Sequence, residues 1–75
     1  MLEVIREIVF KVTGKTNVNM ETDFLEDLAL NSFDVMAIVN EFEERYDINI
    51  TIREVRKLKK VRDVVAFLER KGITA

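Results

Sequence analysis

Cysteine, histidine, tryptophan and proline are all missing from the 75-residue sequence. Without cysteine the chain can form no disulfide and offers no thiolate nucleophile. Without histidine it lacks the commonest general base and metal ligand near neutral pH. These absences leave little for self-contained catalysis, so we expect a protein that is not an enzyme and has no catalytic residues.

Long hydrophobic runs are missing as well. No segment approaches the ~20 apolar residues that a membrane-spanning helix needs. The opening Met1-Leu2-Glu3 leads straight into an amphipathic pattern instead of a secretory leader. We therefore expect a cytoplasmic protein that does not bind membranes.

The residues that are present predict one folded domain, residues 1–75. Hydrophobic residues make up 48% of the chain and charged residues 35%, which is typical of a small helical protein with a single core. The formal net charge of −2 conceals a segregation, because acids dominate residues 17–47 and bases dominate residues 48–75. This arrangement favours docking of specific partners by charge, and we expect the chain itself to be a monomer.

Apolar residues recur at helical spacing in four segments, which predicts an all-α fold. We expect these helices over about residues 2–13, 32–46, 52–57 and 61–71. The third and fourth are poorly separated, because no glycine, proline or good cap lies at residues 58–60. One continuous helix over residues 52–71 therefore stays an alternative.

Residues 14–31 form a long connection between the first two helices, with one helical turn expected near residues 22–27. Four apolar side chains could anchor it, namely Phe24, Leu25, Leu28 and Leu30. Alternating polar residues in it resemble the first ligands of a calcium loop. Thr22 stands where that loop needs glycine and Leu28 where it needs a bidentate glutamate, so we predict no metal site.

The stretch from Phe24 to Met36 organises the rest of the chain. Asn31 is a good N-cap, and Asp34 places a negative charge in the first turn of the second helix. Ser32 then occupies the first helical position, where N–H groups and the positive end of the helix dipole favour an anion. On these grounds alone, a plain capping role for Ser32 stays open.

The spacing Phe24-x-Glu26-Asp27-Leu28-x-x-x-Ser32 resembles the acyl carrier protein signature, Phe-x-Glu-Asp-Leu-Gly-x-Asp-Ser-Leu. The resemblance implies a small four-helix bundle with a long loop between helices one and two and a short third helix. It also implies that Ser32 carries covalent 4′-phosphopantetheine, installed from coenzyme A by a phosphopantetheinyl transferase. Acyl-transfer, condensing or modifying enzymes of fatty acid, polyketide or related lipid biosynthesis would then use the acyl thioesters.

Two further sets of residues follow from this resemblance. The acids of the second helix would dock partner enzymes, and they are Asp34, Glu41, Glu43 and Glu44. Residues between helices two and three would line an acyl-chain pocket, and they are Met36, Val39, Ile52, Val55 and Leu58. Several of the acids crowd the end of the second helix, where the dipole disfavours them, which indicates a used surface or ordinary solvation.

The sequence also departs from the family pattern. Asn31 replaces the usual Asp, Ala29 the Gly, Phe33 the Leu and Thr51 the Pro, while Ala37 stands where fatty-acid carriers usually have Glu. The third-helix region is basic, and the Gly-Gly-x-Ser signature of peptidyl carriers is absent. These departures indicate a specialised acyl carrier.

Two other classes stay open. One is a small helical protein-interaction module in which Ser32 is only a helix cap. The other is a nucleic-acid-binding module that uses the basic residues 53–62, although the acidic remainder of the chain would repel phosphates, so we expect no nucleic-acid partner.

Overall fold

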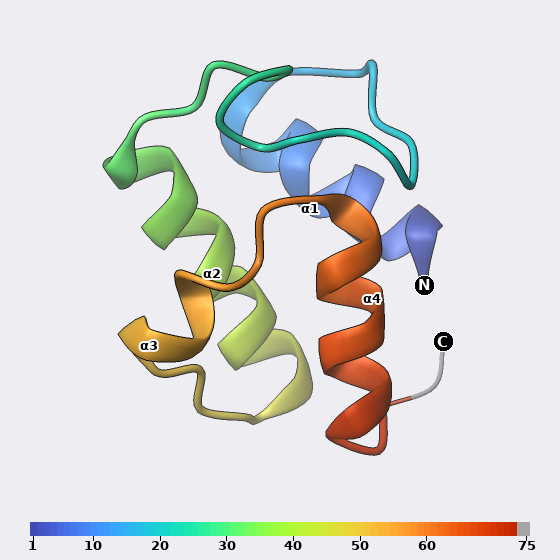
Figure 1. Cartoon of the computed structure of the whole chain (residues 1–75), viewed down its shortest axis with the longest axis vertical. Helices are drawn as coiled ribbons and strands as arrows, with labels where there is room; N and C mark the ends of the chain where they lie inside the picture. The colour runs from blue at the N-terminus through green and yellow to red at the C-terminus, as the bar shows by residue number, and fades with distance from the viewer. Residues whose placement is uncertain (74–75) are drawn as a thin grey trace.

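Four helices and no strand make up residues 1–73, the part of the chain that the computed structural model describes (Figure 1). The helices are α1 (Leu2–Thr13), α2 (Ser32–Tyr46), α3 (Ile52–Val55) and α4 (Val61–Arg70). The predicted all-α bundle with a long first loop and a short third helix is confirmed. The third helix is shorter than expected, because residues 56–57 form a turn.

The core lies where α1 packs against α2 and α4. Ile5, Ile8 and Val9 of α1 are at most 2% exposed, and Val61 and Leu68 of α4 are fully buried. Their helical spacing places the apolar side chains of each helix on one face. The bundle is therefore organised by the same stripes that the sequence shows.

Two ion pairs join the outer faces of α1 and α2. Lys11 Nζ lies 2.7 Å from Glu41 Oε1, and Arg45 Nη1 lies 3.0 Å from Glu7 Oε1. Exposed pairs of this kind add little net stability. They connect α1 to α2, the helix that begins with Ser32.

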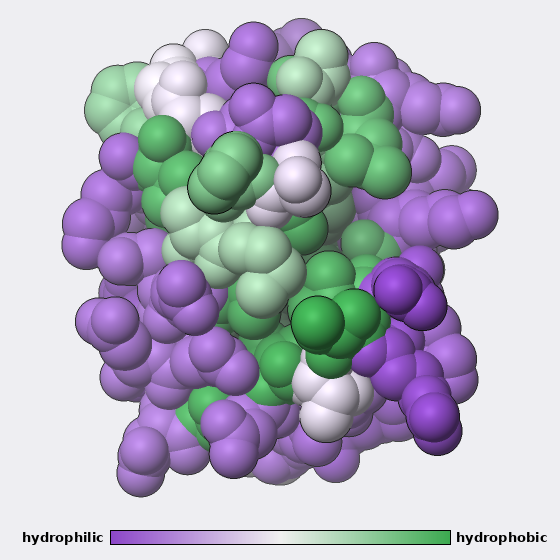
Figure 2. Space-filling view, turned by 90° about the vertical axis from the view of Figure 1, so that its left-hand side faces the viewer, coloured by the Kyte–Doolittle hydropathy of each residue, from purple (hydrophilic) through white to green (hydrophobic). Residues whose placement is uncertain are grey.

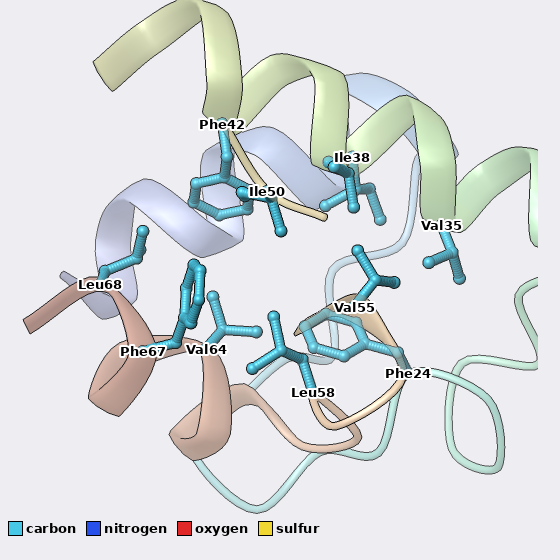
Figure 3. A pocket seen from close by; sticks show the side chains of 11 residues that line it. Phe24, Val35, Ile38, Phe42, Ile50, Val55, Leu58, Val64, Phe67 and Leu68 are labelled. Atoms are coloured by element: carbon cyan, nitrogen blue, oxygen red, sulfur yellow. The ribbon is translucent and has the colours of Figure 1, made fainter. Parts of the chain in front are cut away.

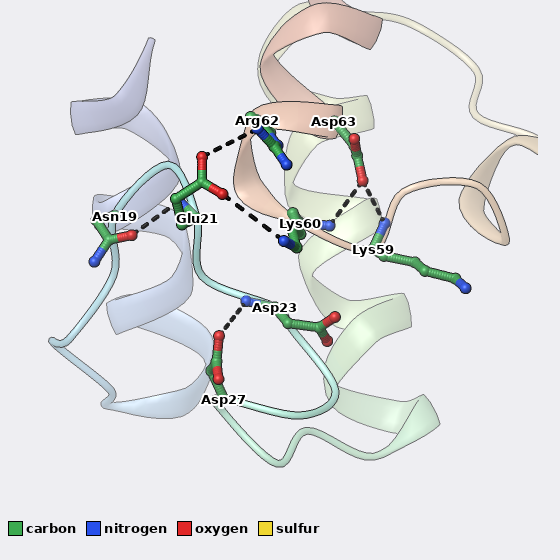
Figure 4. Close-up of polar contacts among 8 residues, drawn as sticks. All are labelled: Asn19, Glu21, Asp23, Asp27, Lys59, Lys60, Arg62 and Asp63. Carbon is green, nitrogen blue, oxygen red and sulfur yellow. Dashed lines mark hydrogen bonds and ion pairs between the residues drawn. The ribbon is translucent and has the colours of Figure 1, made fainter.

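The long loop between α1 and α2 is fastened to the start of α4 (Figure 4). Glu21 approaches Lys60 at 3.7 Å and Arg62 at 3.3 Å, and the backbone of Asp23 forms an isolated antiparallel bridge with that of Lys60. The N–H of Phe24 donates to the carbonyl of Lys59 at 3.0 Å. The loop is thus an ordered part of the bundle.

These loop contacts explain why α4 begins at Val61 without a capping side chain. The N–H groups of Val61 and Arg62 donate to the carbonyls of Thr22 and Met20, each at 3.0 Å. The carboxylate of Asp63 accepts from the preceding backbone N–H groups, as the same figure shows. The alternative of one continuous helix over residues 52–71 is therefore wrong.

The anchoring of the loop differs from the expectation at one residue. Phe24, Leu28 and Leu30 are buried, but Leu25 is 58% exposed and anchors nothing. Val18, which the sequence pattern did not single out, is also buried, with 4% of its surface exposed. None of the helices over residues 1–73 is long and apolar enough to cross a membrane.

Candidate functional site

The start of α2 carries a complete capping box. Asn31 Oδ1 accepts a hydrogen bond from the N–H of Asp34 at 2.9 Å, and Asp34 Oδ2 accepts from the N–H of Asn31 at 3.4 Å. The N–H of Val35 donates to the carbonyl of Asn31. The first turn is therefore closed by residues on either side of Ser32 and not by Ser32 itself.

Ser32 is the first helical residue and is exposed. Within residues 1–73 its hydroxyl takes part in no hydrogen bond, and the N–H groups of Ser32 and Phe33 are the two of this helix start that the capping box does not satisfy. Free N–H groups at the positive end of a helix dipole favour an oxyanion. A phosphodiester on Ser32 Oγ fits this position chemically.

The loop that leads into α2 is held in a defined shape. Asp23 Oδ1 accepts hydrogen bonds from the N–H groups of Glu26 and Leu25, both at 2.9 Å, and these bonds lower the pKa of Asp23 from its usual value. The N–H of Asp27 closes a turn on the carbonyl of Asp23 at 2.9 Å. This is the single turn expected near residues 22–27.

Ala29, just before the site, adopts a left-handed backbone with φ of 53°. Glycine reaches this conformation without strain, whereas a residue with a Cβ meets a steric penalty. The position explains why a glycine is suited to this point of the signature. The chain holds the turn with alanine instead.

The four acids expected to dock partners have different surroundings. Asp34 is half-buried in the capping box, Glu41 pairs with Lys11, and Glu43 Oε2 accepts from the N–H of Ile50 at 2.9 Å. Glu44 is exposed. The structure therefore gives three of the four an intramolecular role, which the sequence alone did not indicate.

An apolar cavity of about 40 Å³ lies between α2, α3 and α4 (Figure 3). Of the five residues expected in an acyl pocket, Val39, Val55 and Leu58 line it, whereas Met36 and Ile52 do not. The sequence reasoning missed the contributions of Phe24 from the loop and of Val64 and Phe67 from α4. From the sequence, Phe24 was expected only as an anchor of the loop and Val64 only as part of the apolar pattern of the fourth helix, and Phe67 was not singled out.

Met36 and Ile52 are exposed instead, as is Phe33, the residue that follows Ser32. Their exposed fractions are 40%, 62% and 86%. Figure 2 looks onto the side of the molecule that holds the start of α2 and α3, and it shows apolar side chains gathered there among hydrophilic ones. Ser32 therefore stands on the helix whose first turns contribute to an apolar face.

Some of the basic residues near α3 form ion pairs, and others are exposed. Lys60 and Arg62 pair with Glu21 of the loop, while Arg53, Arg56 and Lys57 are exposed. No group of three or more acidic side chains that could hold a metal ion occurs in the described part of the chain.

Comparison with known proteins decides the family. Residues 3–68 match the family model described as the phosphopantetheine attachment site. An acyl carrier protein of Akkermansia muciniphila is 37% identical over 70 residues, which cover 91% of this chain and 88% of that protein. An acyl carrier protein of Bdellovibrio bacteriovorus is 34% identical over 70 residues, which cover 91% of this chain and 90% of that protein. The chain belongs to the acyl carrier protein family.

Solved structures agree with this membership at the level of the fold. A candidate acyl carrier protein of Mycobacterium tuberculosis superposes with a TM-score of 0.84 at 21% identity, covering 92% of this chain and 95% of that one. Another, from Anaplasma phagocytophilum, superposes with a TM-score of 0.85 at 22% identity, covering 96% of this chain and 88% of that one. The bundle of this acyl carrier family member is thus the fold of its relatives.

Membership establishes the role in general terms. Acyl carrier proteins are carriers and not enzymes, and the group they hold is phosphopantetheine. They work with a phosphopantetheinyl transferase and with acyl-handling enzymes.

Proposed function

We propose that Ser32 is the phosphopantetheine attachment residue of this carrier. The observation that carries the proposal is the position of its hydroxyl, exposed at the first residue of α2 and excluded from the capping box that closes that helix. The N–H groups of Ser32 and Phe33 would then bind phosphodiester oxygens, and the helix dipole would stabilise their negative charge.

The chemistry of attachment requires little from the carrier. Ser32 Oγ attacks the phosphorus atom next to pantetheine in the diphosphate of coenzyme A. A new P–O bond to serine forms as the P–O–P bond of the diphosphate breaks, and the nucleotide leaves as adenosine 3′,5′-bisphosphate. In this proposal the hydroxyl proton passes to a base of the transferase. The thiol of the attached group then supplies the thioester bond to acyl groups, which the cysteine-free chain cannot supply itself.

Partner enzymes would meet the α2 side of the molecule. Asp34, Glu41, Glu43 and Glu44 remain the proposed docking acids, and the exposed Glu44 is the one we expect to contribute most. Such contacts are salt-sensitive and transient, which suits a carrier that must leave each enzyme after its step. The pathways we propose are fatty acid, polyketide or related lipid biosynthesis. The monomeric state and the cytoplasmic location stay predictions.

A loading assay tests the attachment residue. The wild type, Ser32→Ala and Thr51→Ala are each incubated with a fluorescent coenzyme A analogue and a broad-specificity transferase. Thr51→Ala is the control, because it removes a hydroxyl from the start of another helix, α3. We expect label on the wild type and on Thr51→Ala and none on Ser32→Ala, with all three helical by circular dichroism. Label on Ser32→Ala would refute the assignment.

The two other classes gain no support from the structure. Two of the basic residues expected to contact nucleic acid, Lys60 and Arg62, are engaged with Glu21. A pure interaction module does not account for the match over residues 3–68 to the phosphopantetheine attachment family.

A further inference from the structure

The segment around α3 carries positive charge that the bundle leaves uncompensated. Residues 51–60 hold five basic side chains and a single acidic one, Glu54. Glu54 pairs with Lys71 at 3.3 Å, and one of the bases, Lys60, approaches Glu21 at 3.7 Å. The other four bases are exposed and form no ion pair within residues 1–73, and they are Arg53, Arg56, Lys57 and Lys59.

Three of these bases share a helical surface with an exposed apolar residue. Arg53, Arg56 and Lys57 are spaced i, i+3 and i+4, which makes them neighbours on a helix. The N–H of Arg56 donates to the carbonyl of Ile52 at 3.0 Å, so this geometry continues past the end of α3. Ile52, four residues before Arg56, is 62% exposed. The surface of α3 thus presents an apolar side chain with cations around it.

The positive surface continues from α3 to the end of α4. A hollow between them is lined by four charged and two apolar side chains. Glu54 is the only acid in this lining, and it is already paired with Lys71. The charges of Lys57 and Arg70 have no carboxylate partner among the residues that the structure describes. A ligand of this surface should therefore carry negative charge.

The distribution of charge favours an acidic protein surface over a membrane or a nucleic acid. Anionic lipid and DNA present negative charge over a wide area, so they would also meet the exposed Glu44 and Asp47 at the end of α2. A cluster of carboxylates on a protein is local and can meet the cations of α3 alone. An exposed apolar residue within a charged surround is also typical of a protein interface.

We propose that Arg53, Arg56 and Lys57, together with Ile52, form a second docking surface of this carrier, whose partner is a protein with a carboxylate cluster beside an apolar side chain. The two guanidinium groups bind carboxylates, with which they form paired hydrogen bonds. Ile52 is buried against the apolar side chain of the partner. Because this surface is opposite in charge to the acids of α2, the two recognise different protein surfaces. The proposal does not depend on attachment at Ser32.

A titration with a defined probe tests the proposal on the full chain. The isotopically labelled protein receives a short synthetic peptide of glutamate and leucine, and changes in the amide resonances map the contact and give its Kd. We expect the largest changes within residues 51–57 and a Kd that rises with salt concentration. A peptide of lysine and leucine should cause no such changes.

Two charge reversals provide a matched comparison. Arg56→Glu and Lys15→Glu each replace one positive charge by a negative one, and both residues are exposed and form no ion pair within residues 1–73. Arg56→Glu should raise the Kd of the acidic peptide about tenfold, because like charges then face each other. Lys15→Glu, just after α1, should leave the Kd nearly unchanged. If Arg56→Glu is not helical by circular dichroism, Arg56→Gln and Lys15→Gln replace the pair.

The other outcomes overturn the proposal. Tighter binding of a DNA duplex or of vesicles that contain phosphatidylglycerol would assign the surface to phosphate groups. A dimer in sedimentation that Arg56→Glu dissociates would make a second copy of the chain the occupant. No binding of the acidic peptide, or equal Kd values for Arg56→Glu and Lys15→Glu, would leave α3 an ordinary solvated surface. None of these results affects the loading of Ser32, which protein mass decides separately.

Discussion

Asn31 and Asp34 bond to each other across Ser32, with the N–H of Asp34 donating to Asn31 Oδ1 at 2.9 Å and that of Asn31 to Asp34 Oδ2 at 3.4 Å. Because these two residues close the start of α2, the hydroxyl of Ser32 between them is not needed to cap the helix, and within residues 1–73 it forms no hydrogen bond. The stability of the helix and the chemistry of its first residue are therefore separable by mutation.

The first prediction concerns the cap itself. Asn31→Ala removes the side-chain acceptor and should lower the free energy of unfolding by about 1 kcal/mol. Asn31→Asp is the matched control, because a carboxylate caps as well and adds a favourable charge at the positive end of the dipole. Urea unfolding of the two variants measures the difference. Equal stability of Asn31→Ala and the wild type would contradict the capping role.

The second prediction concerns the strained backbone at Ala29. Its φ of 53° suits glycine, so Ala29→Gly should stabilise the protein by up to about 1 kcal/mol despite the greater freedom of glycine in the unfolded chain. Ala66→Gly, inside α4, is the opposite case and should destabilise by a similar amount. Thermal unfolding distinguishes them. A loss of stability in Ala29→Gly would show that the left-handed turn is not strained.

The third prediction concerns acid pH. The N–H of Thr51, and after it the ammonium group of Lys71, lower the pKa of Glu54 from 4.5. A carboxyl with a lowered folded-state pKa stabilises the fold above its ordinary pKa, and this contribution is lost as pH falls from there through the folded-state value. The Tm of the wild type should therefore fall between ~pH 5 and ~pH 3.

Glu54→Gln isolates that carboxyl, since glutamine can still complete a capping box. Its Tm should fall less steeply over the same pH range, whereas Glu69→Gln, at an exposed site on α4, should follow the wild type. A Glu54→Gln curve parallel to that of the wild type would remove Glu54 from the explanation.

The fourth prediction concerns docking. Glu44→Gln should slow loading by the transferase at low salt, because it removes an exposed charge from α2. The difference from the wild type should vanish near 1 M salt, where the Debye length is only about 3 Å. Glu69→Gln again serves as the control. Initial loading rates at the two salt concentrations give the answer, and identical rates for Glu44→Gln and the wild type at low salt would exclude Glu44 from docking.

The sequence was most informative where structure is determined by nearby residues. α1 and α2 have the predicted bounds because Gly14 ends one in a left-handed conformation and Asn31 begins the other. The start of α4 was ambiguous because its first N–H groups donate to the carbonyls of Met20 and Thr22, which lie far earlier in the chain. No local pattern shows such partners.

The same limit applies to the site. Ser32 could be proposed as the attachment residue from the sequence because its signature is contiguous. The intramolecular bond of Glu43 to the N–H of Ile50 and the exposure of Ile52 depend instead on how α3 sits against the bundle. Phe67, which the sequence pattern did not single out, lines the inner cavity from α4. Helical spacing defines faces, and contacts between faces require the structure.

Intact-protein mass after incubation with coenzyme A and a broad-specificity phosphopantetheinyl transferase tests the central claim most directly. The wild type should gain the mass of one phosphopantetheine, and fragmentation should place that mass on the peptide that contains Ser32. Ser32→Ala should keep its original mass while remaining folded. No gain by the wild type, or a gain by Ser32→Ala, would contradict the account.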